Sequence, residues 1–159
     1  RYPYLGLTQN WMAEDYEAVD RVLEQLSLQD LAHRFYSQLS GGEKQRVLIA
    51  RALAQDTHYI FLDETLSQLD INHQIDIMVL LRKILAENKK GILLISHNLN
   101  LSANFADRMV FLSMGRILGS GTPEDMMKPE LLKELFGIEL LTMLNPLSGK
   151  PNILYPGMK

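Results

Sequence analysis

Residues 59–64 read YIFLDE, an apolar run that ends in two acidic residues, and residues 91–97 read GILLISH, a second apolar run that ends in two polar ones. Both runs have the length and composition of strands that are buried on both faces of a parallel sheet. Between them, a long helix is predicted, with apolar side chains along one face at Ile71, Ile75, Met78, Val79 and Leu85. This alternation of strand and helix predicts an α/β fold with parallel strands.

The residues that end these two runs suit phosphate chemistry. In a parallel sheet the carboxyl ends of the strands share one edge, where ligands bind. Asp63 is suited to hold a hydrated Mg²⁺, and Glu64 to orient or deprotonate an attacking water. A neutral imidazole at His97 is suited to hydrogen-bond a phosphate or to order that water. The alternative for each residue, taken alone, is an ordinary polar side chain at the end of a strand.

A second stretch, LSGGEKQR at residues 39–46, predicts a sharp helix start. Ser40 and Glu43 form the pattern of a capping box, and the helix is expected to run to about Gln55, buried on nearly every side. A helix N-terminus presents free N–H groups, and glycines allow a phosphate to approach the backbone closely. Ser40 adds a hydroxyl donor. The alternative is a simple capping box in which the glycines occur by chance.

Local signals outline the rest of the chain. A helix is predicted after Trp11, with a short helical piece near residues 30–34. A helix near residues 99–106 leads to a strand at 108–112, and a turn then leads to a partner strand at 116–119. Helix starts are expected at Thr122 and near Lys128. The tail from residue 138 to residue 159 reads as two short strands.

Composition excludes several classes of protein. The net charge is −3, which argues against a broad nucleic-acid or anionic-membrane surface, so no nucleic-acid partner is expected. The sequence has no cysteine, which excludes disulfides and thiolate metal sites. No apolar run reaches the roughly 20 residues that a transmembrane helix needs.

Taken in order, these stretches resemble the ABC ATPase family. Residues 39–46 resemble its signature motif, residues 59–64 its Walker B motif, residues 67–70 its D-loop, and His97 its switch histidine. The resemblance implies a P-loop NTPase-like parallel sheet with flanking helices and a partial helical subdomain, incomplete without an N-terminal region. It also implies a division into part of the helical subdomain (1–36), the C-terminal part of the ATPase core (37–137) and C-terminal strands (138–159).

The resemblance further implies the role of each site residue, with ATP and Mg²⁺ as cofactors. Glu64 and His97 are expected to be catalytic, and Asp63 to bind the metal. The residues expected to contact nucleotide are Ser40, Gly41, Gly42, Gln45 and Asp70. In the family two copies enclose two ATP molecules, and the signature of one copy faces the nucleotide held by the other.

Finer features resemble the subfamily that imports metal chelates such as iron–siderophore, haem and cobalamin, or related oxyanions such as molybdate. The segments that carry this likeness are Tyr4 and Gly6, 69–74, 97–101, 105–108 and 121–124. The expected partners are a second copy, transmembrane permease subunits and, indirectly, a substrate-binding protein. The expected location is cytoplasmic, peripheral on the inner face of the membrane. Two alternatives are a soluble ABC ATPase without a transport role and a non-catalytic fragment that only binds partners.

The sequence departs from the family pattern in three places. It contains no G-x-x-x-x-G-K-[ST] stretch, the P-loop that cradles phosphates, so this segment alone is expected not to hydrolyse ATP at a useful rate. The resemblance implies that the P-loop, the adenine-stacking aromatic and the glutamine loop precede Arg1. Thr65 stands where the family usually has proline, and Asn98 where it often has aspartate.

Overall fold

A computed structural model describes residues 11–88 and 90–155. It divides the chain into two units, Arg1–Ser96 and His97–Lys159, and each unit is described by itself. The opening segment, with Tyr4 and Gly6, lies outside the described residues. The division into segments 1–36, 37–137 and 138–159 stays a prediction.

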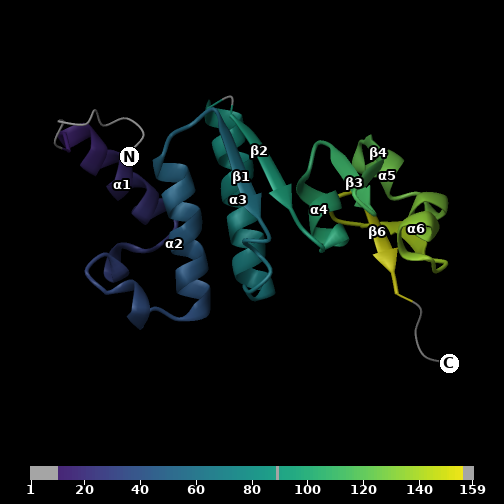
Figure 1. Ribbon diagram of the computed structural model, residues 1–159, viewed down its shortest axis with the longest axis horizontal. Helices are drawn as coiled ribbons and strands as arrows, with labels where there is room; N and C mark the ends of the chain where they lie inside the picture. The colour runs from purple at the N-terminus through teal and green to yellow at the C-terminus, as the bar shows by residue number, and fades with distance from the viewer. Residues whose placement is uncertain (1–10, 89, 156–159) are drawn as a thin grey trace. The chain divides into compact units, whose positions relative to one another are not determined.

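The first unit contains the parallel strand pair that the sequence predicts. β1 (Tyr59–Asp63) and β2 (Gly91–Ile95) pair in parallel, with Asp63 opposite Ile95, and α3 (Ile71–Asn88) connects them. Figure 1 shows the two strands running side by side next to α3. The strand–helix–strand order and the parallel pairing are therefore confirmed.

The prediction that both strands are buried on both faces is wrong. In β1, Ile60 and Leu62 are buried, whereas Tyr59 and Phe61 are 70% and 72% exposed. In β2, Leu93 and Ile95 are about half exposed. Successive side chains of a strand point to opposite faces, and the described residues cover only one face of this pair. An apolar strand cannot by itself indicate which of its faces is covered.

The apolar face predicted for α3 coincides only in part with the face that the helix buries, since Met78 is shared by both. The side chains that this helix buries are Ile77, Met78, Leu81 and Ile84. Ile71, Ile75 and Val79 are exposed instead. Apolar residues surround much of α3, so a spacing of three and four residues fits more than one face, and packing decides between them.

The other regular elements among the described residues of the first unit are helical. α1 (Ala13–Gln25) packs against α2 (Gly41–Ala54), and the short turns η2 (Gln29–Leu31) and η3 (Tyr36–Gln38) lie between them in the chain. The start of α2 directly after Ser40 confirms the predicted helix start. Its burial differs from the prediction, because only Ile49, Ala50 and Leu53 are buried along it.

The second unit is built from short helices and two antiparallel hairpins. Its helices are α4 (Leu99–Phe105), α5 (Pro123–Met126) and α6 (Pro129–Phe136). β3 (Met109–Ser113) pairs with β4 (Arg116–Gly121), which confirms the predicted hairpin, and β5 (Leu141–Leu144) pairs with β6 (Pro151–Leu154), which confirms the two strands of the tail and shows that they pair. The buried core of this unit consists of Ala103, Met109, Phe111, Met126, Met127, Leu132, Leu140 and Ile153.

Candidate functional site

The tip of α2 is held by a reciprocal pair of hydrogen bonds. The Ser40 hydroxyl accepts from the backbone N–H of Glu43 at 3.3 Å, and the Glu43 carboxylate accepts from the backbone N–H of Ser40 at 2.7 Å. The Ser40 backbone N–H is the main reason that the pKa of Glu43 is lowered, so this carboxylate is ionised at neutral pH. Ser40 is exposed, so the helix tip is open to a ligand.

The two glycines of this tip are not required by the fold. A Cβ at Gly41 would meet nothing within 4 Å, and a Cβ at Gly42 would meet only Leu69 Cδ2, at an ordinary 3.6 Å. Neither residue has a positive φ, and alanine favours a helix more than glycine does. The N–H groups of a helix's first turn have no partner within the helix. The tip therefore offers open space beside free donors, which suits the close approach of a phosphate.

Glu64 has a strained backbone at the end of β1. Its φ is +48°, a left-handed conformation that costs a non-glycine residue about 1–2 kcal/mol of conformational energy. Its N–H donates to the carbonyl of Ile95 at 3.1 Å, while its own carbonyl accepts from the N–H and the hydroxyl of Ser67, at 3.1 and 2.8 Å. Both backbone groups of Glu64, its N–H and its carbonyl, are thus hydrogen-bonded. Strain of this kind is often found at functional sites.

The two acidic side chains at this position, Asp63 and Glu64, are both exposed at the carboxyl end of β1. Among residues 11–88 and 90–155, no group of three or more His, Cys, Asp or Glu side chains is placed to hold a metal. Mg²⁺ is commonly bound through one or two carboxylates together with waters and substrate phosphates. A single exposed carboxylate at Asp63 fits that mode.

The loop after Glu64 is fixed to the start of α3. Asp70 caps this helix: one carboxylate oxygen accepts from the backbone N–H of His73 at 3.0 Å, and the other lies 2.8 Å from Nδ1 of the same residue. These contacts, the backbone bond first, lower the pKa of Asp70. The Gln74 amide donates to the carbonyls of Leu66 and Leu69, at 2.9 and 3.0 Å. The structure therefore gives Asp70 a local role as a helix cap, and its contact with nucleotide stays a prediction.

Gln74 was not predicted as a site residue. A glutamine in the first turns of a helix carries no sequence signal of its own, because its role depends on carbonyls five and eight residues away. The other predicted nucleotide contact on this unit, Gln45, lies further along α2 and is half-buried.

His97 begins the second unit and is exposed. It directly precedes Asn98, whose side-chain oxygen accepts from the backbone N–H of Leu101 at 3.1 Å and caps α4. Asparagine caps a helix as well as aspartate does. The departure from the family pattern at this position therefore leaves the helix start after His97 intact.

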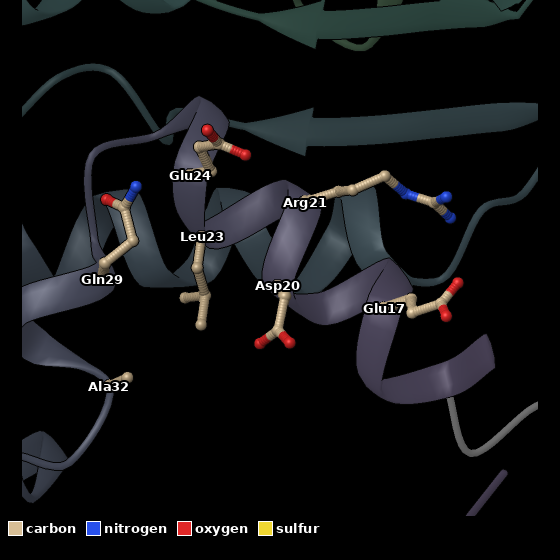
Figure 2. Close-up of a pocket in the computed structure, with 7 residues that line it drawn as sticks. All are labelled: Glu17, Asp20, Arg21, Leu23, Glu24, Gln29 and Ala32. Atoms are coloured by element: carbon tan, nitrogen blue, oxygen red, sulfur yellow. The ribbon is translucent and has the colours of Figure 1, made fainter. Parts of the chain in front are cut away.

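A separate groove of about 530 Å³ lies on α1 and the segment after it. Figure 2 shows its lining, which includes the carboxylates of Glu17, Asp20 and Glu24 and the guanidinium of Arg21. Three acidic groups and one basic group give it a net negative lining, which disfavours an anionic nucleotide. The tip of α2 is the better place for a phosphate.

Comparison with known proteins agrees with these features. Residues 3–67 match the family model described as ABC transporter. The chain is 38% identical over 151 residues to the Probable siderophore transport system ATP-binding protein YusV of Bacillus subtilis, covering 95% of this chain and 55% of that protein. It is 34% identical over 154 residues to the Ferric enterobactin transport ATP-binding protein FepC of Escherichia coli, covering 97% and 57%. The chain therefore spans about half the length of the curated relatives that it matches.

Solved structures show the same likeness. A protein described as a metal-chelate type ABC transporter, in an inward-facing conformation, superposes with a TM-score of 0.81 at 27% identity, covering 97% of this chain and 62% of that one. The dimeric bacterial ABC transporter cassette MJ0796 superposes with a TM-score of 0.67 at 31% identity, covering 76% and 51%. These neighbours confirm the predicted fold class.

Proposed function

Because this chain belongs to the family of ABC transporter ATPases, we propose that the protein hydrolyses ATP to energise the import of a metal chelate or a related oxyanion. The names of its relatives support this substrate class, since those proteins serve siderophore, ferric enterobactin and hemin transport. The activity, substrate and partners of the whole protein are parts of the proposal.

The observation that best supports hydrolysis is the conformation of Glu64. Hydrogen bonds to Ile95 and Ser67 hold the backbone of Glu64 in a disfavoured left-handed conformation at the end of β1. Its carboxylate is exposed there. In the proposed reaction Glu64 orients or deprotonates the attacking water, and His97 donates a hydrogen bond to that water or to the γ-phosphate. Asp63 would hold the Mg²⁺, and the cation would neutralise negative charge on the phosphates.

The tip of α2 is proposed to act on a nucleotide that a second copy binds. Ser40, Gly41 and Gly42 supply a hydroxyl and first-turn N–H groups to the γ-phosphate. Gln45 and Asp70 are proposed to border the same nucleotide. This arrangement requires a homodimer, and the dimer is proposed to drive permease subunits, with a substrate-binding protein as an indirect partner.

The proposed location is the cytoplasmic face of the inner membrane, where the protein is held by its permease. No helix among the described residues is both long and apolar enough to cross a bilayer. The alternatives remain a soluble ABC ATPase without a transport role and a non-catalytic fragment that only binds partners.

One experiment separates these functions. We expect the complete protein to hydrolyse Mg-ATP and to copurify with a membrane permease, and the 159-residue chain alone to bind Mg-ATP weakly, because its sequence lacks a P-loop. Isothermal titration measures the binding of Mg-ATP, and phosphate release measures its hydrolysis. Micromolar affinity of the 159-residue chain would contradict the proposed inactivity of the segment. A complete protein that hydrolyses Mg-ATP but does not copurify with a permease would favour the soluble ATPase.

The Ser40 hydroxyl has a close structural match in Thr122, which makes a pair of variants informative. Each hydroxyl caps a helix by accepting from a backbone N–H at 3.3 Å. Ser40→Ala and Thr122→Ala should each lower the unfolding free energy by about 1 kcal/mol, as removal of a cap does. Only Ser40→Ala should slow ATP turnover in the complete protein. Equal turnover in the two variants, measured by phosphate release, would remove the hydroxyl of Ser40 from the phosphate contact.

A further inference from the structure

A set of asparagine side chains joins α4 to the C-terminal hairpin of β5 and β6. The Asn100 amide nitrogen donates to the carbonyl of Ile153 at 3.2 Å, and its oxygen accepts from the N–H of Ile153 at 2.7 Å. One side chain thus satisfies both backbone groups of a residue 53 positions later in the chain. Because Ile153 is 4% exposed, these backbone groups have little access to water if the pair is broken.

Asn104, one turn along α4, extends the network. Its nitrogen donates to the carbonyl of Asn100 at 2.7 Å and to the side-chain oxygen of Asn152 at 2.6 Å. Its oxygen accepts from the side-chain nitrogen of Asn145 at 3.1 Å and from the hydroxyl of Ser148. An asparagine side chain has two donor hydrogens and two acceptor lone pairs, so all four are used.

A fully satisfied network of this kind specifies one orientation. Any rotation or shift of α4 against the hairpin would leave several half-buried polar groups without partners, and each such group costs about 1–3 kcal/mol. Apolar packing reinforces the same contact, because Ala103 of α4 and Ile153 of β6 lie in one core. The hairpin therefore sets the position of α4.

This helix begins directly after His97. Asn98 caps its N-terminus by accepting from the backbone N–H of Leu101. Asn100, in the first turn, is bonded to Ile153 of β6. The residues that directly follow His97 are therefore fixed by the cap and by the hairpin. We propose that Asn100 is a positioning residue for His97, and that the C-terminal hairpin, by holding α4, fixes the backbone from which the imidazole extends. This inference rests on the catalytic role of His97 in the proposed function.

The test uses Asn100→Asp in the complete protein. The aspartate keeps an acceptor for the N–H of Ile153 but places an oxygen where the amide donated to the carbonyl of Ile153. We expect kcat to fall about tenfold with a nearly unchanged KM for ATP, because the histidine acts on turnover and not on nucleotide capture.

The control for stability alone is Leu132→Ala, which removes a fully buried side chain from the same core without touching the asparagine network. It should lower the unfolding temperature at least as much as Asn100→Asp while kcat stays near wild type below that temperature. If Asn100→Asp fails to fold, Asn145→Ala, which removes one network bond to Asn104, should still lower kcat and spare KM.

The outcomes distinguish a failure of the positioning role of Asn100 from a failure of the proposed role of His97. A wild-type kcat in Asn100→Asp, together with a large loss in His97→Ala, overturns the positioning role and leaves the proposed function standing. A raised KM in Asn100→Asp overturns the positioning role as well. A wild-type kcat in His97→Ala overturns the proposed role of His97 and, with it, this inference.

Discussion

Glu64→Gln in the complete protein should leave Mg-ATP bound while turnover falls by about 10²–10⁴-fold, the usual contribution of a positioned acid–base group. The amide is close in size to the carboxylate, and the residue's backbone bonds to Ile95 and Ser67 do not involve the side chain. The left-handed conformation is therefore expected to persist. What is lost is the group that accepts a proton from the attacking water.

The measurement is phosphate release beside nucleotide binding by titration. The matched control is Glu134→Gln, which replaces an exposed glutamate on α6, and it should leave turnover unchanged. A dimer that accumulates with ATP bound would support the proposal directly, because closure would then proceed and hydrolysis would not. Normal turnover in Glu64→Gln would remove this residue from the catalytic role.

The second large effect is expected from Gly42→Ala, which should reduce turnover at least about tenfold, equal to about 1.4 kcal/mol, without destabilising the fold. The new Cβ would lie 3.6 Å from Leu69 Cδ2, an ordinary contact, and alanine gains up to about 1 kcal/mol of helix preference over glycine. The same Cβ would occupy the space through which a phosphate reaches the first-turn N–H groups.

This variant separates stability from function because the two are expected to move in opposite directions. Thermal unfolding should show an unchanged or higher midpoint, while phosphate release falls. Glu130→Ala, at the second position of α6 as Gly42 is at the second position of α2, is a control for an added alanine at a helix start away from the candidate site, and it should leave turnover unchanged. A stable Gly42→Ala variant with full turnover would rule out close phosphate approach at this tip.

Short-range signals determined much of this structure. The caps at Ser40 and Thr122 and the helix end at Gly137, which has a φ of +73°, each depend on residues within about one turn of chain. The parallel pair and both hairpins follow from apolar runs and the turns between them. The four motif stretches, and with them the candidate residues from Ser40 to His97, can be read directly from their order along the chain.

Only the tertiary structure decided which surfaces these elements bury and how the site is held. The sequence alone determined that β1 and α3 are apolar, but Phe61 and Val79 proved to be exposed, because burial depends on what packs against each face. The left-handed backbone of Glu64 and the pairing of Asn100 with Ile153 leave no local pattern. The N–H of Glu64 bonds to Ile95 and the side chain of Asn100 bonds to Ile153, partners from distant parts of the chain that are chosen by packing rather than by neighbouring sequence.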